Sequence, residues 1–518
     1  MIKTKKLQLL VTSDIHGYLM PTTYRRTLEP LGLVKLASII EELREQRPSM
    51  LIDNGDLIQG SPLASYYHTN HTRTRNPIID VANFLNYDVA VFGNHEFNYG
   101  LPFLKKAVSQ SQFPWLSGNI SRKDGKPFTQ PYIIKELDGI LIGIVGVTTH
   151  FVPVWENASH IEGLDFHDAF ESAKRWIAHI RQHENVELVV LCYHGGFSHD
   201  LSSGELIEPY TGENQGYLMC KELDFDILIS GHQHREIATN AFDKSVVQPG
   251  TKGNCLAVIT IDLDIQNGQI INKHHEATLH YVEENTPAHP QVSSLLESIH
   301  HQTENWLDEP IGTIEGNMLF EDAFHVRVYK HPYIEFIQNV QMASTNTSIS
   351  CTALFHDGSG GFPKDVTMRH LVTNYIFPNT LKVLRVKGKH IVKALEQNAS
   401  YFSLMNGELT ISESFRYPKA QPYNYDMWEG INYVLDIRRP IGERVTEVTF
   451  QDEPLNLQAS YDVVMNNYRA SGAGNFPYFS ECSIVKDVQI DMTELLARFF
   501  EKNPIVKAQC RRNWTIVF

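Results

Sequence analysis

The segment Gly93-Asn-His-Glu-Phe-Asn-Tyr-Gly100 places an amide, an imidazole and a carboxylate directly after a short apolar run, Val89–Phe92. The apolar run predicts a buried strand, and the glycine at 93 lets the backbone turn sharply where that strand ends. Loops at the carboxyl ends of strands are where α/β proteins place their sites. The segment therefore predicts a functional site on an α/β or α+β layered domain.

Four other apolar runs in the first half of the chain end in the same kind of polar cluster. The clusters are Asp14-Ile-His16 after Leu7–Thr12, Asn54-Gly-Asp56 after Met50–Asp53, Tyr193-His-Gly-Gly196 after Leu188–Cys192 and Gly231-His-Gln-His234 after Ile227–Ile229. One Asp-x-His pair arises by chance more often than as a pair of ligands. An ordered series after five predicted strands makes coincidence a poor explanation.

The ligand-type side chains of this series suffice for two metal ions that share one carboxylate. Asp14, His16, His234 and Asp56 would complete one coordination sphere, and Asn94, His194, His232 and the same Asp56 would complete the other. Oxygen and imidazole ligands suit Mn²⁺ or Zn²⁺, with Fe as the alternative. Two such ions roughly 3.5–4 Å apart support in-line displacement at phosphorus, in which a metal-bound hydroxide attacks.

His95 remains after these ligands are assigned, and it adjoins Asn94. Its imidazole could stabilise charge on a phosphoryl group or protonate the leaving oxygen. The alternative is a histidine that only supports the metal ligands.

Composition limits the partners of the chain. It has 518 residues, with 45 Lys and Arg against 60 Asp and Glu, a formal net charge of −15. This balance disfavours a sequence-independent grip on DNA, whereas a small phosphate ester can still bind where metal ions supply positive charge. The six cysteines form no CxxC pair, so neither a disulfide framework nor a thiolate zinc site is expected.

The amino terminus has no long apolar segment or cleavage site typical of a secretory signal. No run approaches the ~18 apolar residues that span a bilayer. We therefore expect a soluble, cytoplasmic protein without a membrane partner.

The pattern along the chain changes around Asn285-Thr-Pro-Ala-His-Pro290. Before it, apolar runs alternate with helical stripes, as in Leu33–Arg44 and Phe166–His183, and further strands are expected at Leu141–Val147 and Leu256–Leu263. After it comes one amphipathic helix, about Gln291–Leu307, and then strands such as Leu381–Val386 and Tyr433–Ile437. We expect a metal-bearing domain over 1–285, a linker helix over 286–310 and a second α+β domain over 311–518.

The five polar clusters together resemble the calcineurin-like metallophosphoesterases. Gly93–Gly100, Gln248-Pro-Gly250 and the carboxyl-terminal domain extend the resemblance, over nearly the whole chain, to the two-domain 5′-nucleotidase and 2′,3′-cyclic-nucleotide 2′-phosphodiesterase superfamily. The resemblance implies a four-layer α/β/β/α metallophosphatase sandwich, joined by a linker helix to a smaller α+β nucleotide-binding domain.

The residue at position 98 and three segments of the second domain resemble the cyclic-phosphodiesterase/3′-nucleotidase branch of that superfamily. In 5′-nucleotidases an aspartate lies three residues after the catalytic histidine, whereas this chain has Asn98 there, as the cyclic branch does. Asn98 can orient His95 but cannot share its charge. The segments Tyr375–Leu381, Tyr425–Gly430 and Asn466–Gly472 also resemble that branch.

The resemblance implies an aromatic clamp for the nucleobase made by Tyr425 and Tyr468, with Asn467 and Arg469 placed to contact base, ribose or phosphate. Stacking on aromatic faces is worth ~1–3 kcal/mol per base. The alternative for each tyrosine is a buried core residue. The glycine-rich stretch His356–Phe362 lacks the phosphate-binding arginines of 5′-nucleotidases, so it is either a loop of backbone amides near the substrate or a plain turn.

We therefore expect a dinuclear-metal hydrolase that opens 2′,3′-cyclic nucleotides to 3′-nucleotides and then removes the 3′-phosphate. His95 would assist the leaving ribose oxygen. The alternatives are a 5′-nucleotidase or UDP-sugar hydrolase on the same site, a nucleotide-sensing protein with weak hydrolysis, and a purely structural metal protein. The expected partner is a small nucleotide, and the oligomeric state stays open.

Overall fold

The computed structural model describes residues 2–70, 74–207, 211–377, 379–488 and 490–518. Pro378, in the Tyr375–Leu381 segment, lies outside the described residues. The chain divides into two compact units, Met1–Thr303 and Glu304–Phe518, and the division falls inside helix α8 (Pro290–Leu307). That helix lies where the amphipathic pattern predicts it.

The first sheet of unit 1 has the strand order β14-β13-β1-β2-β3-β4. Its strands are β1 (Lys3–Thr12), β2 (Ser49–Asp53), β3 (Val89–Val91), β4 (Trp115–Leu116), β13 (Cys255–Gln266) and β14 (Gln269–Tyr281). β1 to β4 run parallel, with Val11 opposite Ile52, while β13 and β14 are antiparallel to their neighbours. The carboxyl ends of β1, β2 and β3 therefore share one edge.

The second sheet of unit 1 has the order β11-β12-β10-β9-β7-β6. Its strands are β6 (Tyr132–Leu137), β7 (Ile140–Thr148), β9 (Leu188–His194), β10 (Ile227–Ser230), β11 (Glu236–Ala241) and β12 (Lys244–Pro249). β7, β9, β10 and β12 are parallel, and β6 and β11 close the two sides antiparallel. A small ladder joins β5 (Ile120–Arg122) to β8 (Leu164–Phe166).

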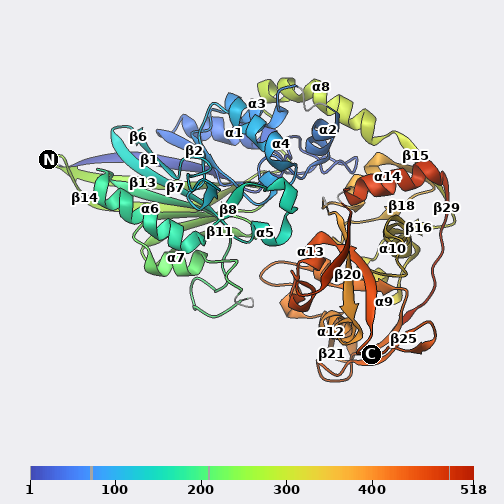
Figure 1. Ribbon diagram of the computed structural model, residues 1–518. Helices are drawn as coiled ribbons and strands as arrows, with labels where there is room; N and C mark the ends of the chain where they lie inside the picture. The colour runs from blue at the N-terminus through green and yellow to red at the C-terminus, as the bar shows by residue number, and fades with distance from the viewer. Residues whose placement is uncertain (1, 71–73, 208–210, 378, 489) are drawn as a thin grey trace. The chain divides into compact units, whose positions relative to one another are not determined.

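Unit 1 has the expected four layers, α/β/β/α (Figure 1). Alternation along β9 shows how they form: Leu188, Val190 and Cys192 belong to the core between the sheets, whereas Val189, Leu191 and Tyr193 pack in a second core with α6 and α7. The outer helices are α1 (Leu33–Arg44), α3 (Pro77–Phe84) and α4 (Gly100–Gln110) on one side, and α6 (Ala169–His183) and α7 (Gly216–Glu222) on the other.

The predicted strands and helices of unit 1 are confirmed, with one shift at α6. This helix begins at Ala169 rather than at Phe166, because Leu164–Phe166 forms β8 and Asp168 caps the helix by accepting a hydrogen bond from the Glu171 amide. The shorter helix α2 (Pro62–Asn70) lies between β2 and β3 in the chain, and α5 (Val152–Trp155) lies between β7 and β9.

Unit 2 is a separate α+β fold. Its largest sheet has the order β23-β17-β27-β20-β28, formed by β17 (Ile349–Ala353), β20 (Leu381–Lys387), β23 (Asp426–Glu429), β27 (Ser460–Asn466) and β28 (Ser483–Val488). The other sheets combine β15 (Pro310–Glu315), β19 (Asp365–Thr367) and β29 (Ile505–Lys507); β24 (Asn432–Asp436), β25 (Val445–Phe450), β26 (Glu453–Pro454) and β30 (Trp514–Val517); β16 (Met318–Leu319) and β18 (Gly361–Phe362); and β21 (Phe402–Met405) and β22 (Glu408–Ile411).

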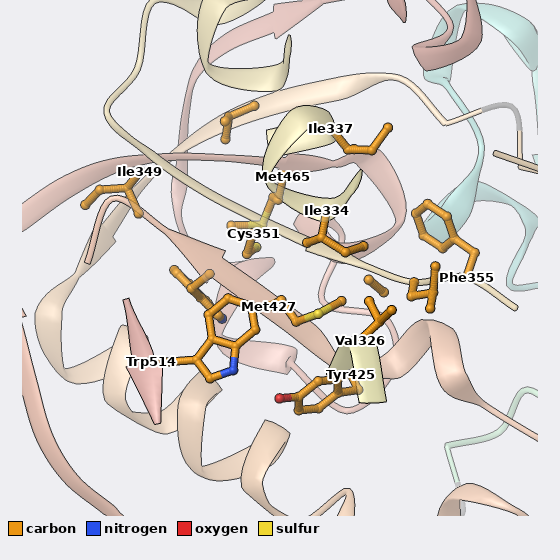
Figure 2. Close-up of a cluster of buried hydrophobic side chains, with 14 of the residues drawn as sticks. Val326, Ile334, Ile337, Ile349, Cys351, Phe355, Tyr425, Met427, Met465 and Trp514 are labelled. Atoms are coloured by element: carbon orange, nitrogen blue, oxygen red, sulfur yellow. The ribbon is translucent and has the colours of Figure 1, made fainter. Parts of the chain in front are cut away.

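One hydrophobic core joins these elements of unit 2 (Figure 2). Ile334 and Ile337 of α10 (Pro332–Thr345) pack with Cys351 of β17, Met427 of β23 and Met465 of β27. The remaining helices of this unit are α9 (Ala323–Tyr329), α11 (Met368–Asn374), α12 (Gly388–Ala399), α13 (Asn467–Ala470) and α14 (Met492–Lys502).

All six cysteines of the chain are free, as expected. Within the described ranges, no helix combines the length and the apolar character needed to cross a membrane.

The core between the two sheets of unit 1 gives a stability prediction. Ile259 on β13 is fully buried in that core, so Ile259→Ala should lower the free energy of unfolding by about 2–5 kcal/mol through loss of apolar contact and a residual cavity. Ile271→Ala on the neighbouring strand β14 is the control, because that side chain is 51% exposed. Thermal denaturation checks both variants, and equal losses of stability would contradict this account of the core.

Candidate metal centre

The seven predicted metal ligands lie together where strands of the two sheets in unit 1 end. In the first group, Nε2 of His16 is 3.1 Å from Nε2 of His234, and the latter is 3.4 Å from Oδ1 of Asp14. Oδ2 of Asp56 is 3.9 Å from Nε2 of His16.

The second group surrounds Asn94. Its Oδ1 is 3.2 Å from Nε2 of His194 and 2.9 Å from Nδ1 of His232. Nε2 of His194 is also 3.2 Å from Oδ2 of Asp56. Oδ2 of Asp56 thus borders both groups, which fits the bridging role predicted for it.

These spacings fit divalent cations. For metal–ligand bonds of about 2.0–2.2 Å, neighbouring ligand atoms are about 2.8–3.1 Å apart in octahedral geometry and about 3.3–3.6 Å apart in tetrahedral geometry. Among the described residues, three sets of side chains could hold an ion: Asp14, His16 and His234; Asp14, Asp56 and His194; and His16, Asp56 and His95. The residues present therefore suit two oxygen- and imidazole-bound ions.

Hydrogen bonds behind the ligands fix which atoms face the site. His194 and His16 donate through Nδ1 to the carbonyls of Asn54 (2.7 Å) and Gln59 (3.1 Å), which leaves Nε2 for a metal. His232 is reversed: its Nε2 contacts Oε1 of Glu213 at 2.8 Å, so Nδ1 faces Asn94.

In both Asp14 and Asp56, one carboxylate oxygen accepts a hydrogen bond from the protein and the other faces the histidines. Oδ2 of Asp14 accepts a hydrogen bond from the Ser13 hydroxyl at 2.6 Å, and Oδ1 of Asp56 accepts one from the His95 amide at 2.7 Å. Oδ1 of Asp14 and Oδ2 of Asp56 are the oxygens turned towards the imidazoles.

The backbone at the strand ends is bent to aim these side chains. Five of the seven ligands have left-handed φ values, a conformation uncommon outside glycine: Asp14 (55°), His16 (51°), Asp56 (56°), His232 (70°) and His234 (56°). Glycine is required nearby, because a Cβ at position 93 would lie 2.2 Å from Oδ1 of Asp56 and one at 231 would lie 2.4 Å from Oγ of Ser13.

Glu96 holds the loop that carries Asp56. Its buried carboxylate accepts hydrogen bonds from the amides of Gly93 and Asp56 through Oε2, and from Leu57 and Ile58 through Oε1, at 2.6–3.2 Å. Burial and the charge of Asp56 raise the pKa of Glu96 to about 7, although the amide donors favour the ionised form. Glu96 lies in the segment Gly93–Gly100, but the sequence pattern does not indicate this role, because it depends on contacts with the loop after β2.

The charges of the site compensate one another. Burial would raise the pKa of Asp56, yet His194 and His95 hold it well below its ordinary value. Burial disfavours a charged His194, but Asp56 raises the pKa of this imidazole to about 10, whereas burial lowers that of His16 to about 3. A buried negative charge of this strength is what attracts a divalent cation.

His95 lies beside the ligand groups, with its ring centroid 5.1 Å from that of His16. Its Nδ1 is 2.6 Å from Oδ1 of Asn98, a contact through which Asn98 can orient the ring. Nδ2 of Asn98 in turn donates to Oε2 of Glu156 at 2.6 Å. Neither Glu156 nor Glu213 was identified from the sequence, because each lies far along the chain from its partner and in no recognisable motif.

The predicted nucleobase clamp is not formed by Tyr425. This tyrosine is fully buried in the core of unit 2 (Figure 2). It stacks on Tyr401 at 4.8 Å between ring centroids and donates its hydroxyl to the Arg327 carbonyl. It is a core residue, the alternative left open above, because no ring face is exposed for a base. Tyr468 is half-buried and lies 6.2 Å from Tyr423, ring centroid to centroid.

Arg469 is also in the core rather than exposed to a ligand. It is 1% exposed, pairs with the buried carboxylate of Asp426 and lies 3.9 Å from the centroid of the Phe476 ring. Asn467 is half-buried, and its Oδ1 accepts a hydrogen bond from the Thr380 amide at 3.1 Å.

The glycine-rich stretch 356–362 has the features of a turn. The amides of Gly360 and Gly361 both donate to Oδ1 of Asn374, at 2.9 and 3.0 Å. Since these two donors are already used within the fold, the structure favours the plain turn over the loop of backbone amides.

The two groups of possible metal ligands are compatible with a metal-dependent hydrolase, and comparison with known proteins identifies the family. The calcineurin-like phosphoesterase family matches residues 7–236, and the 5′-nucleotidase C-terminal domain matches residues 310–481. The chain belongs to the family that joins these two domains and is a metal-dependent phosphoric ester hydrolase; the calcineurin-like family uses a dinuclear divalent metal site.

Three similar proteins span nearly the whole chain. A 2′,3′-cyclic-nucleotide 2′-phosphodiesterase/3′-nucleotidase of Yersinia enterocolitica is 28% identical, covering 99% of this chain and 88% of its own length. One of the same name from Haemophilus influenzae is 27% identical, with 99% and 87% covered. A crystal structure of a Staphylococcus aureus protein assigned as a 5′-nucleotidase, in complex with alpha-ketoglutarate, has 36% identity, a TM-score of 0.92 and coverage of 99% and 100%.

Replacing Glu96 tests its role in holding the site. In Glu96→Gln an amide NH₂ group must face backbone N–H donors, so we expect a loss of about 1–3 kcal/mol in the free energy of unfolding and reduced metal content. Elemental analysis and thermal denaturation measure both effects. Glu136→Gln, at an exposed position on β6, is the control, and a Glu96→Gln protein with full metal content would contradict the role.

Proposed function

We propose that the chain hydrolyses 2′,3′-cyclic nucleotides to 3′-nucleotides and then removes the 3′-phosphate. The observation that carries this proposal is the contact of 2.6 Å between His95 and Asn98 beside the two ligand groups. The resemblance described above associates asparagine at this position with the cyclic-phosphodiesterase branch. The relatives from Yersinia enterocolitica and Haemophilus influenzae support the proposal further. Both are named for this activity, and the similarity covers 88% and 87% of their own lengths.

In this proposal, one set of residues binds the metal ions and His95 donates the proton. Asp14, His16, Asp56, Asn94, His194, His232 and His234 would hold two divalent ions, for which Mn²⁺ or Zn²⁺ suits the oxygen and nitrogen ligands and Fe is the alternative. When bound, such ions neutralise phosphate oxygens and activate a water molecule. Because Nδ1 of His95 is engaged by Asn98, its Nε2 is the ring nitrogen that would give a proton to the departing ribose oxygen.

A cluster of aromatic rings in unit 2 is a better candidate for the nucleobase than Tyr425. Phe377, Tyr423 and Tyr468 are all half-buried, and their ring centroids lie 6.1 Å (Phe377 to Tyr423) and 6.2 Å (Tyr423 to Tyr468) apart. We propose that these rings contact the base. Asn467, next to Tyr468, stays a candidate for base or ribose, whereas Arg469 supports this segment from the core.

A 5′-nucleotidase is the second candidate, because the similar Staphylococcus aureus protein carries that assignment. Both candidate activities would use the same metal ligands. They differ in the ribose oxygen that leaves phosphorus, which is O5′ in a 5′-nucleotidase and O2′ and then O3′ in the first candidate. The expected partner in either case is a small nucleotide. The cytoplasmic location expected from the sequence stays a prediction.

The choice of substrate can be measured directly. We expect the Mn²⁺-loaded protein to release product from 2′,3′-cyclic AMP and 3′-AMP faster than from 5′-AMP or UDP-glucose, with phosphate and nucleoside followed by chromatography. His95→Ala should lower kcat on the cyclic substrate by about 10²–10⁴-fold. A preference for 5′-AMP would instead favour the second candidate.

The aromatic cluster predicts a separable effect on nucleotide binding. Tyr468→Ala should raise KM for 3′-AMP about 5- to 150-fold, the equivalent of ~1–3 kcal/mol of base stacking, while KM for p-nitrophenyl phosphate stays unchanged. Tyr329→Ala, at a tyrosine that is 47% exposed, serves as the matched control. An equal rise in KM for both substrates would show that Tyr468 does not contact the base.

A further inference from the structure

Glu156 holds a buried carboxylate directly behind the residues that orient His95. Its side chain is 7% exposed, and it follows helix α5, whose Trp155 stacks on the ligand His232 with 5.4 Å between ring centroids. Oε1 of Glu156 contacts the amide of Asn157 at 2.7 Å and Nδ1 of His160 at 2.9 Å. Oε2 is thereby left to accept the hydrogen bond from Nδ2 of Asn98.

This contact decides which way the Asn98 amide points. An asparagine can present either its oxygen or its NH₂ group to a neighbour, and only the oxygen can accept a hydrogen bond. Because a carboxylate accepts and cannot donate, Glu156 holds the NH₂ group on its own side and leaves Oδ1 facing His95. Nδ1 of His95 must then carry a proton, and Nε2 is the nitrogen turned away from this chain of contacts.

We propose that Glu156 is a positioning residue for His95, acting through Asn98. The proposal rests on the proposed function, in which a water oxygen bonds to phosphorus and gives its proton to solvent, while the bond from phosphorus to the ribose oxygen breaks. His95 enters this step as the imidazolium, with a proton on each ring nitrogen. Its Nε2 proton moves to the ribose oxygen, which leaves the neutral imidazole with Nδ1–H still donating to Asn98. With the Asn98 amide held by Glu156, the imidazole is presented in the one orientation that serves this transfer. If the amide turned round, its NH₂ group would face Nδ1–H of the imidazolium, so two donors would meet and the acid form of His95 would lose its acceptor.

In Glu156→Gln the side chain keeps its size but no longer fixes the orientation of the Asn98 amide. Glutamine has one acceptor oxygen where Glu156 uses two, so it cannot accept from both Asn98 and the Asn157 amide. We expect kcat on 2′,3′-cyclic AMP to fall about 10- to 100-fold with little change in KM. Bis(p-nitrophenyl) phosphate, whose leaving group needs no proton, should be hydrolysed within about threefold of the wild-type rate.

A double mutant separates positioning from a structural role. If Glu156 acts through His95, adding Glu156→Gln to His95→Ala should change kcat on the cyclic substrate by no more than about twofold, whereas independent effects would multiply. Glu162→Gln, an exposed glutamate six residues along, is the matched control. Metal content should equal that of the wild type in all of these variants.

An exchange of groups gives a second, independent test. Asn98→Asp places two carboxylates against each other and should impair the enzyme, while Asn98→Asp combined with Glu156→Gln lets the glutamine NH₂ group donate to the new carboxylate. We expect this combination to recover activity on 2′,3′-cyclic AMP relative to either single variant.

The outcomes distinguish this inference from the proposed function. Equal losses on both substrates, loss of metal in Glu156→Gln, or multiplying effects in the double mutant would overturn the role of Glu156. A wild-type protein that prefers 5′-AMP would overturn the proposed function alone, and the same comparison made on 5′-AMP would then decide the role of Glu156.

Discussion

Four backbone N–H groups converge on the carboxylate of Glu96, and the geometry of the metal centre depends on that contact. It fixes the loop after β2, and with it Asp56, whose Oδ2 borders both ligand groups. Left-handed backbone at five of the ligands costs energy, so the ligand loops need support from outside the ligands themselves. Glu96 supplies it at the loop of Asp56, and the His232 amide, which donates to the Asp14 carboxylate, ties the loops after β1 and β10 together.

Burial of Asp14 and Asp56 would be costly without compensating charge. In the protein alone, His194 supplies it, and for that reason the pKa of its imidazole is raised to about 10. A metal ion bound at Nε2 of His194 would take the place of that proton, so binding of cations and loss of the proton from His194 would be coupled. The net charge of −15 is therefore compatible with an anionic substrate, because cations bound at this site would make the potential around them positive.

The strands and the ligand cluster could be predicted because both leave local signals in the sequence. Apolar runs that end in Asp-x-His, Gly-Asp or Gly-His-x-His identify the edge of the sheets, and the seven predicted ligands lie together there. The roles of Glu156 and Glu213 could not be predicted, since each depends on a contact between distant segments. Tyr425 shows the opposite error: a motif places it beside a binding segment, but only packing against Tyr401 and Phe402 shows that its ring is inaccessible.

Position 98 is an asparagine in this chain, where 5′-nucleotidases have an aspartate. The side chain in contact with His95 is therefore neutral, and the nearest carboxylate in that chain of contacts is Glu156. An aspartate there would put a negative charge in direct contact with His95, whereas Asn98 is neutral. The Asn98 amide instead joins His95 to the carboxylate of Glu156, through contacts of 2.6 Å on either side. Because Coulomb interaction falls with distance, the charge of Glu156 acts on His95 more weakly than a carboxylate in direct contact would. His95 is thus oriented by a neutral side chain, and the charged member of this chain of contacts lies beyond Asn98.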